Sequence, residues 1–393
     1  MVVKRISTIL VVIIGLCLCA AMLPNEASAA AFVEKKPEGL MATASKGKIS
    51  VTWEKVPGAK TYAVYRNMRR LSTDPKTGLT LTGQNTRKAV SQLKYRRILV
   101  TKKTKAIIKS CKKGYEYSFY VEARREVKIN GVKTTEISQK SSIRSTTVPY
   151  EGKSTIKNFL RTGISPIGST MYIWGGGWNG FAGNNSEQKF KTGLSPKWRS
   201  FANKHKSNYN YVRYLLQREK GLDCSGFVGN CVYNVMETSN NRQSYVTSAY
   251  REGIYYSSLG FGKYVSNKLV GTRKAGDVMT CATHVWICLG ECTDGSAVVL
   301  HSSPPMVSLA GTPSDKGVSN SKAVKLARKY MKKYYPELYK NYPNSVYRGS
   351  TYNSSYGRMR WNKKTLADPE GYKNMTAKKV LKDLFSEREV PEK

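Results

Sequence analysis

The feature that most limits how this chain can fold is an alternation of apolar and polar side chains that recurs between residues 37 and 148. Ile49, Val51 and Trp53 occupy every second position of one such segment, and the same period returns in residues 115–123. A period of two is the pattern of a β-strand with one buried face. About 110 residues of short strands separated by glycine-containing turns predict an all-β sandwich.

This segment, residues 37–148, also resembles a bacterial fibronectin type III domain. The resemblance is carried by Pro37 with Leu40, by Trp53, by the PGAKTYAVYR sequence at 57–66, and by Gly114 placed three residues before Tyr117. It implies two packed antiparallel sheets over the whole segment.

The N-terminus has the pattern of a secretory signal peptide over residues 1–29. Lys4 and Arg5 precede an apolar run at 9–23, and the small residues at 27–29 follow it. The run is short for a membrane span, which needs ~20 residues, and no later stretch is apolar enough to span a bilayer. We therefore expect a secreted or cell-wall-associated protein with no membrane span after cleavage; an uncleaved N-terminal anchor is the alternative.

The charge of the chain is strongly positive, with 66 Lys and Arg against 26 Asp and Glu, a formal net charge of +40. Residues 66–113 alone carry 15 basic side chains and one acid, Asp74. Such a segment is expected to bind a polyanion by releasing its counterions. Because Tyr95 is the only aromatic there that could stack on bases, an anionic wall polymer such as teichoic acid is favoured over nucleic acid. A solvated surface loop remains open.

The cysteines do not form the framework of a disulfide-rich scaffold. Signal cleavage would leave six of the eight: Cys111, Cys224, Cys231, Cys281, Cys288 and Cys292. No pair has the CxxC spacing, and only three histidines could join them, so no metal site and no cofactor are predicted. Cys288 and Cys292 could form a disulfide or remain free thiols.

The sequence GLDCSGF at 221–227 predicts the start of a helix. Asp223 is a good N-cap residue, and Cys224 would then be the first residue inside the helix. The helix dipole and the free N–H groups at that position favour a thiolate. Cys231 follows two turns later and is expected to pack in the core.

Two of the three histidines fall on predicted strands. His284 opens the alternating sequence 283–290, and His301 lies near the end of 297–303. An antiparallel pair formed by these strands would bring the two imidazoles side by side. His205 lies in a polar stretch and is expected on the surface.

The order of four motifs resembles the NlpC family of papain-like cell-wall cysteine peptidases. These motifs are DCSGF, the GDV sequence at 276–278, the HVWICLG strand at 284–290 and a strand-borne histidine. An upstream YIWGGG at 172–177 resembles another element of that family. The resemblance implies an α+β papain-like domain. By it, Cys224 matches the nucleophile, His284 the general base, His301 the residue that orients the base, Tyr172 a residue near the nucleophile, and Asp223 and Ser225 residues that flank the substrate.

The expected organisation is therefore multi-domain, with the sandwich followed by a peptidase core at 149–310. Two regions depart from the family pattern. An insertion at about 179–220 is expected to reshape the substrate groove, and a basic helical extension occupies 311–393. In that extension, an amphipathic helix at 321–335 and a second helix at 376–385 are expected to dock on the core.

By the same resemblance, the expected reaction is hydrolysis of a peptidoglycan stem peptide between D-γ-glutamate and a diamino acid. An N-acetylmuramoyl-L-alanine amidase or an acyl transferase could use the same three residues. A non-catalytic wall-binding surface protein is the third alternative. The oligomeric state is left open.

Overall fold

The structure, a computed structural model, describes residues 32–45, 47–70, 72–73, 80–81, 94–148, 154–177, 192–236 and 245–386. The expected signal peptide at 1–29 and Asp74 of the basic segment lie outside the described residues. Within the described ranges, no helix is long and apolar enough to cross a membrane.

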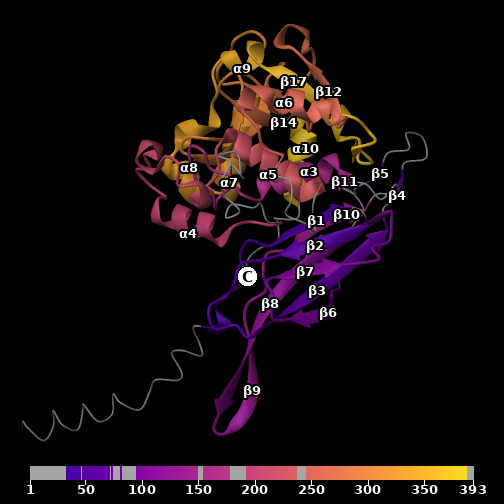
Figure 1. Ribbon diagram of the computed structural model, residues 1–393, viewed down its shortest axis with the longest axis vertical. Helices are drawn as coiled ribbons and strands as arrows, with labels where there is room; N and C mark the ends of the chain where they lie inside the picture. The colour runs from indigo at the N-terminus through magenta and orange to yellow at the C-terminus, as the bar shows by residue number, and fades with distance from the viewer. Residues whose placement is uncertain are drawn as a thin grey trace, which may run out of the picture.

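The N-terminal domain is a sandwich of two antiparallel sheets (Figure 1). The first sheet has the order β1-β2-β7, with β1 (Met41–Ser45), β2 (Lys48–Thr52) and β7 (Lys105–Ile108). The second has the order β10-β8-β3-β6, with β9 also paired to β8. Its strands are β3 (Thr61–Arg70), β6 (Arg96–Thr101), β8 (Tyr115–Ile129), β9 (Val132–Ile137) and β10 (Arg144–Val148). The short strands β4 (Ser72–Thr73) and β5 (Thr80–Leu81) pair with each other.

The core of the sandwich contains the side chains that the alternation places inside. Ile49 and Val51 of the first sheet are fully buried against Val64, Phe119 and Val121 of the second. Burial of an aliphatic or aromatic side chain of this size contributes about 1.5–3 kcal/mol each to folding. The β-sandwich predicted from the period-two pattern is confirmed.

The C-terminal domain is built on a six-stranded antiparallel sheet. Its order is β12-β17-β13-β14-β15-β16. The strands are β12 (Gly262–Val265), β13 (Val278–Thr280), β14 (Val285–Glu291), β15 (Ala297–Ser303), β16 (Met306–Gly311) and β17 (Gly357–Trp361). A two-residue parallel pair, β11 (Ser154–Thr155) with β18 (Leu366–Ala367), lies beside it.

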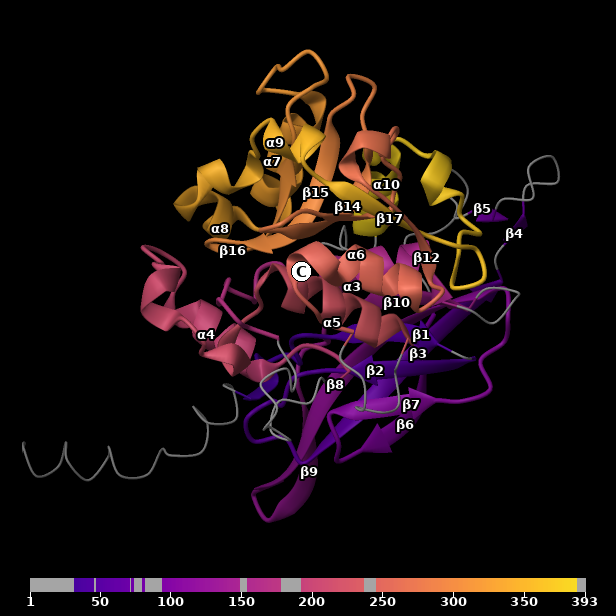
Figure 2. The same ribbon diagram turned by 45° about the horizontal axis from the view of Figure 1, so that its top comes forward.

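Helices cover one face of this sheet, and α3 and α5 lie between the sheet and the sandwich (Figure 2). The α-helices are α3 (Ile156–Ile164), α4 (Pro196–Lys204), α5 (Cys224–Met236), α6 (Ala249–Ser258), α7 (Lys322–Tyr334), α8 (Pro336–Asn341), α9 (Thr351–Ser354) and α10 (Ala377–Phe385). Short 3₁₀ turns are η2 (Tyr211–Tyr214), η3 (Arg218–Lys220), η4 (Asn267–Leu269), η5 (Pro343–Val346) and η6 (Tyr372–Asn374).

The two faces of β14 belong to two different cores. Val285 and Ile287 pack into the cluster that contains the helices, whereas Trp286 and Cys288 point to the opposite face and pack with Tyr356. Because side chains alternate along a strand, the face that carries Trp286 is covered by the segment around Tyr356 and not by α5. This alternation along β14 agrees with the sequence pattern.

The C-terminal extension is part of the domain and not an appendage. Its predicted helices are present as α7 and α10, and Tyr330 and Tyr334 of α7 contact Phe385 of α10, with ring centroids 4.9 and 4.8 Å apart. The extension also supplies β17, which lies between β12 and β13 in the sheet. The sheet therefore includes a strand from beyond the boundary expected at residue 310. The sequence did not reveal β17, because a five-residue strand carries too little pattern to be recognised.

A buried ion cluster joins the two domains. Glu116 of β8 accepts a hydrogen bond from Arg69 of its own domain (2.7 Å) and one from Arg161 of α3 (3.1 Å). The Glu116 side chain is 2% exposed. Burial alone would raise its pKa, but the charges of Lys157, Arg161 and Arg69 outweigh burial and lower it to about 2.

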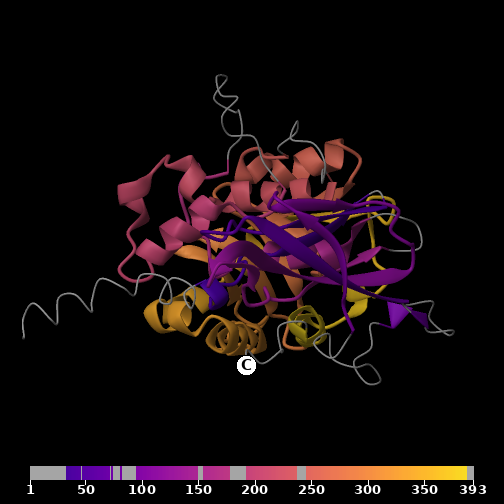
Figure 3. The ribbon, with the colours of Figure 1, turned by 90° about the horizontal axis from the view of Figure 1, so that it is seen from below.

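Further contacts hold the domains in one orientation. Asn158 of α3 accepts from the Thr147 N–H (3.2 Å) and donates to the Thr147 carbonyl (3.0 Å). Arg199 of α4 donates to Glu54 of the sandwich (2.8 Å). Viewed from below, the sandwich strands cross in front of the C-terminal domain (Figure 3).

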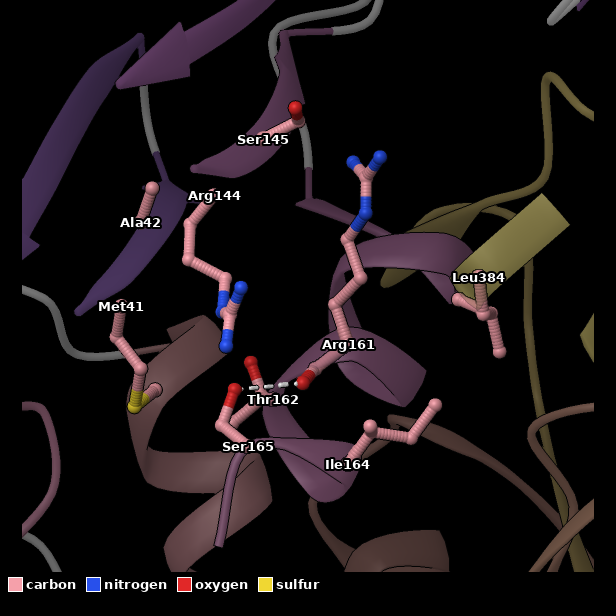
Figure 4. A pocket seen from close by; sticks show the side chains of 9 residues that line it. All are labelled: Met41, Ala42, Arg144, Ser145, Arg161, Thr162, Ile164, Ser165 and Leu384. Atoms are coloured by element: carbon pink, nitrogen blue, oxygen red, sulfur yellow. Dashed lines mark hydrogen bonds between the residues drawn. The ribbon is translucent and has the colours of Figure 1, made fainter. Parts of the chain in front are cut away.

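A narrow pocket marks the junction (Figure 4). It is lined by Met41 and Ala42 of β1, Arg144 and Ser145 of β10, residues of α3 including Arg161, and Leu384 of α10. Ser165 closes the end of α3 by donating to the Arg161 carbonyl (2.9 Å). Elements far apart in sequence therefore meet at this one interface.

Replacing Glu116 by Gln should weaken the whole chain and not the sandwich alone. Loss of the buried charge leaves Arg69 and Arg161 without their counterion, which should cost about 3 kcal/mol of unfolding free energy at neutral pH. The pKa of Glu116 is lower in the folded than in the unfolded chain, where it is 4.5. Its contribution is thus complete above that pH and is lost as the pH falls toward 2.

Urea unfolding followed from neutral to acid pH measures this effect. Wild type should lose stability steeply over the acid range, and Glu116→Gln should show a flatter dependence. Glu126→Gln, an exposed position on the same strand, is the matched control and should behave as wild type. Equal acid dependence in Glu116→Gln and wild type would contradict the assignment.

Candidate active site

The carboxylate of Asp223 holds the start of α5. Its Oδ1 accepts hydrogen bonds from the Gly226 N–H (2.6 Å) and the Ser225 hydroxyl (3.0 Å), and its Oδ2 accepts from the Gly175 N–H (3.1 Å). The first of these is the N-cap bond predicted from the sequence, and the helix begins at Cys224 as expected. The last one fastens the preceding glycine-rich loop to the helix start.

Two glycines make this close approach possible. A Cβ atom on Gly226 would lie 2.0 Å from the carbonyl oxygen of Gly176, and one on Gly176 would lie 2.6 Å from that of Gly221. No side chain fits at either position without movement of the backbone. The YIWGGG and DCSGF sequences are therefore two halves of one packed unit.

Cys224 is the first residue of α5 and is 7% exposed. The backbone of Val285, the residue after His284, lies close enough to the sulfur to favour its ionised form. Burial raises the pKa of the thiol, the neighbouring Asp223 carboxylate raises it further, and the backbone hydrogen bonds from Val285 and Ser225 lower it by less. In this conformation burial and the Asp223 charge outweigh the backbone groups of Val285 and Ser225, so the pKa of the thiol is raised.

His284 and His301 lie side by side, as the antiparallel strands predict. Nε2 of His284 is 2.9 Å from Nδ1 of His301, and the two rings are inclined by 78°. His301 is 0% exposed and His284 is half-buried. Ser302 donates to the carbonyl of Leu222 (2.7 Å), which ties β15 to the residues just before Cys224.

Arg348 lies on the other side of His301. Its Nε and Nη2 are 3.1 and 3.0 Å from Nε2 of His301, and its Nη1 donates to the Tyr347 carbonyl (3.0 Å). A guanidinium has no acceptor, so Nε2 of His301 must present its lone pair. A neutral His301 then carries its proton on Nδ1 and donates it to Nε2 of His284.

Electrostatics keeps this pair of histidines neutral. Burial, together with the positive charge of Arg348, lowers the pKa of His284 to about 3. Burial, Arg348 and His284 also lower the pKa of His301 well below its usual value. The site in this conformation thus contains a thiol and two neutral imidazoles, and proton transfer requires a change in the surroundings of the pair.

Two tyrosines complete the surroundings of the histidines. The ring of Tyr352 lies 5.7 Å from that of His284 and 6.2 Å from that of His301, and Tyr356 lies 5.0 Å from Tyr352. With Arg348, these side chains come from the extension after residue 310. Sequence reasoning missed all three because they lie beyond the region of family resemblance and no motif marks them.

Tyr172 lies next to the cysteine, and Asp223 and Ser225 form part of the helix start. Tyr172 is 5% exposed, its ring contacts that of Tyr211 edge-on at 5.4 Å, and burial and then the neighbouring Cys224 and Asp223 raise its pKa. Asp223 and Ser225 are also buried. The structure therefore brings these predicted residues together around Cys224, with polar atoms already engaged in holding the helix start.

The expectation that His205 lies on the surface is wrong. His205 is half-buried, with Nδ1 2.8 Å from the Phe201 carbonyl oxygen and Nε2 2.8 Å from the Tyr214 hydroxyl. Its ring stacks on Phe201 with centroids 4.0 Å apart. It packs inside the aromatic cluster of the insertion, where the flanking polar residues concealed the apolar contacts.

The six cysteines of the described chain are all free thiols, including Cys288 and Cys292, whose pairing the sequence left open. Cys231 is fully buried in the core, as predicted. Among the described residues, no group of three or more His, Cys, Asp or Glu side chains is arranged to hold a metal ion.

Comparison with known proteins concerns the sandwich. An Fn3-like protein from Clostridium thermocellum is 24% identical, with 28% of this chain and 91% of that chain covered and a TM-score of 0.17. The FN5 domain of Drosophila Lar is 15% identical, with 30% and 98% covered and a TM-score of 0.19. Each of these matches covers about 30% of this chain, and the architecture of the sandwich is established by its own two antiparallel sheets. No protein-family model and no curated protein matches the sequence, and nothing identifies the family of the C-terminal domain.

Removing the charge of Asp223 should make Cys224 more acidic without unfolding the helix start. Asp223→Asn keeps the Oδ1 acceptor but removes the carboxylate that raises the pKa of the thiol. Asp223→Ala also removes the cap and should cost about 1–2 kcal/mol of stability. The measurement is the alkylation rate of Cys224 against pH, resolved by peptide mass spectrometry.

Cys292 serves as the internal reference in each sample, because it is half-buried and lies on the loop after β14. In Asp223→Asn the Cys224 profile should move to lower pH while that of Cys292 stays in place. Superimposable Cys224 profiles in wild type and Asp223→Asn would show that Asp223 does not act on the thiol.

Proposed function

We propose that this protein is an exported, papain-like cysteine peptidase of the NlpC type that cleaves peptidoglycan stem peptides between D-γ-glutamate and a diamino acid. The observation that carries the proposal is the placement of Cys224 at the first position of α5, close to the backbone of Val285. Val285 begins β14, His284 directly precedes it, and His284 is hydrogen-bonded to His301 of the neighbouring strand β15. A nucleophile, a base and an orienting group are the parts that acyl transfer needs.

Each residue has a defined part in the proposed reaction. His284 becomes the imidazolium when the Cys224 thiol loses its proton, and the Cys224 thiolate attacks the γ-carbonyl carbon of the glutamyl residue. The tetrahedral oxyanion accepts a hydrogen bond from the backbone N–H of Cys224 at the helix N-terminus. The imidazolium of His284 then protonates the leaving amine, and water, activated by the same imidazole, hydrolyses the thioacyl intermediate.

The positions of Tyr172, Asp223 and Ser225 support roles in shaping this site. Tyr172 is buried and close enough to Cys224 for their charges to interact, so its side chain can orient the peptide at the scissile bond. Asp223 and Ser225 fix the helix N-terminus that supplies the oxyanion contact. Trp174 is 55% exposed in the same glycine-rich loop and offers an apolar surface to a bound stem peptide or glycan.

Digestion of purified sacculi tests the proposal. The mature wild-type chain should release fragments cut between D-glutamate and the diamino acid, and Cys224→Ala should release none above background. Cys292→Ala, a half-buried thiol on the loop after β14, is the matched control and should keep wild-type activity. A chelator is included throughout, because no step of the scheme needs a metal.

The masses of the fragments separate the alternatives. Cuts at the lactyl amide that depend on Cys224 would make the protein an N-acetylmuramoyl-L-alanine amidase, and new amide links between stems would make it an acyl transferase. Absence of any Cys224-dependent product from several wall types would refute the peptidase and leave a wall-binding protein.

The proposed partner outside the active site is an anionic wall polymer. Helices α7 and α10, which contact each other, expose a set of cations: Lys322, Lys325, Arg328, Lys329, Lys332, Lys333, Lys378, Lys379 and Lys382. The sandwich exposes a second set around β6 and β7: Lys94, Arg96, Arg97, Lys102, Lys103, Lys109, Lys112 and Lys113. Either set can bind the phosphodiester chain of a teichoic acid by releasing the counterions of the polymer.

Binding of Cys224→Ala to teichoic acid-containing walls should weaken steeply with salt. If six or more cations contact the polymer, affinity should fall roughly a thousandfold between about 50 and about 200 mM salt. A variant with Lys325, Lys329, Lys332 and Lys379 changed to Gln and a matched variant with Lys102, Lys103, Lys109 and Lys112 changed to Gln assign the contact to one set. An affinity that does not change with salt would refute this mode of wall attachment.

A further inference from the structure

We propose that Arg348 forms a carboxylate-binding subsite beside the histidine pair and that it recognises the α-carboxylate of the D-glutamyl residue at the scissile bond. This inference rests on the proposed function and names the group that the site selects. The carboxylate on binding takes over the guanidinium that otherwise contacts His301, so recognition of the substrate and preparation of the histidines become one event.

The first observation is that Arg348 has no anionic partner among the described residues. Three other buried or half-buried arginines of the C-terminal domain bind carboxylates: Arg161 binds Glu116, Arg273 binds Glu291, and Arg360 binds Asp277. Half-buried Arg358 donates to the backbone carbonyls of Val270 and Thr272. Arg348 instead contacts the neutral ring of His301 and the carbonyl of Tyr347. A half-buried guanidinium without an acid is costly to keep unless a ligand completes it.

The second observation concerns the donors that remain. A guanidinium has five N–H groups, and here Nε and one N–H of Nη2 point at the same His301 nitrogen while one N–H of Nη1 binds Tyr347. One N–H on Nη1 and one on Nη2 have no acceptor among the described residues. Two N–H donors on the two terminal nitrogens are the number that the two oxygens of a carboxylate accept.

The third observation is that the backbone fixes Arg348 in place. The Arg348 N–H donates to the Gly311 carbonyl at the end of β16 (3.0 Å), and Tyr347 forms a parallel bridge with Gly311. Tyr352 and Tyr356 lie close enough to affect the charge of Arg348, and Tyr352 is also close enough to Cys224 for their charges to interact. The backbone contacts at Gly311 and the two tyrosines therefore keep the guanidinium beside the histidine pair.

The proposed ligand follows from the chemistry of the scissile residue. When a glutamyl residue is linked through its γ-carboxyl, its α-carboxylate stays free, on the same residue whose γ-carbonyl Cys224 attacks. A charge-assisted bidentate contact in a half-buried site discriminates strongly against the α-carboxamide, which is uncharged and presents an N–H₂ group to the guanidinium.

Binding of the carboxylate changes what His301 can do. While Arg348 donates to Nε2 of His301, that nitrogen cannot carry a proton, and Nδ1–H of His301 points at His284. Once the carboxylate has engaged the two unused N–H groups and drawn the guanidinium away from Nε2 of His301, the Nδ1 proton of His301 can pass to Nε2 of His284. Nε2 of His301 then receives, through water, the proton that leaves the Cys224 thiol. The number of protons is unchanged, and the products are a thiolate, an imidazolium at His284 and a neutral His301.

A pair of peptides tests the subsite. L-Ala-γ-D-Glu-L-Lys and L-Ala-γ-D-isoglutamine-L-Lys, both with an amidated C-terminus, differ only in the α-carboxylate. Wild type should cleave the first with kcat/KM at least tenfold above the second. Arg348→Gln should lose most of this preference, and Arg348→Lys should keep part of it, because the charge remains without the fork.

Binding to the inactive Cys224→Ala chain separates this inference from the proposed function. That chain should bind the D-glutamyl peptide at least tenfold more tightly than the D-isoglutaminyl peptide, and adding Arg348→Gln should equalise the two affinities. If wild type cleaves both peptides with equal kcat/KM and Arg348→Gln lowers both alike, the subsite is refuted while the peptidase stands. If neither peptide is bound or cut, both are refuted.

The pH profile distinguishes a subsite residue from one that only supports the fold. Because Arg348 lowers the pKa of His284 and His301, Arg348→Gln should move the acid limb of kcat/KM for the D-isoglutaminyl peptide to higher pH. An unchanged acid limb, in a variant with wild-type thermal unfolding, would overturn the contact between Arg348 and the histidine pair.

Discussion

The carboxylate of Asp223 is the interaction on which the C-terminal site depends. Its two oxygens accept hydrogen bonds from the start of α5 and from the glycine-rich loop. One side chain therefore fixes both the position of Cys224 and the position of the loop beside it. The same charge raises the pKa of the thiol that it positions. Asp223 therefore both positions Cys224 and opposes ionisation of its thiol, and the proposed peptidase reaction requires other groups to favour the thiolate.

The groups opposite Asp223 are the neutral pair His284 and His301, with the Arg348 guanidinium beside His301. Burial and Arg348 both disfavour an imidazolium at His284, so a thiolate–imidazolium pair gains no support from the surroundings in this conformation. The positive charge of Arg348 disfavours an imidazolium beside it. A bound anion would offset this charge and would accept hydrogen bonds from the N–H groups of Arg348 that have no acceptor among the described residues. The electrostatics and the hydrogen bonds of Arg348 thus both support the proposal that this arginine binds an anionic group of the substrate.

Sequence patterns predicted the parts of this chain that depend on local periodicity or on a short motif. The alternation around Val51 and Phe119, the cap at Asp223 and the pairing of His284 with His301 are of this kind. The raised pKa of Cys224 was not predictable, because the motif shows the helix N-terminus but not the burial that raises the pKa. Arg348 and β17 were not predictable either, since both act through contacts with strands tens of residues away.

The position of β17 explains why the extension and the site cannot be separated. This strand lies between β12 and β13, so the sheet that carries His284 is completed only after the chain has passed through α7 and returned. The segment that makes this return contains Arg348 and Tyr352, and it covers the sheet face on which His284 and Trp286 lie. Folding of the extension and assembly of the histidine surroundings are consequently the same process. A chain truncated after β16 would lose β17 together with Arg348 and Tyr352, which contact the histidine pair.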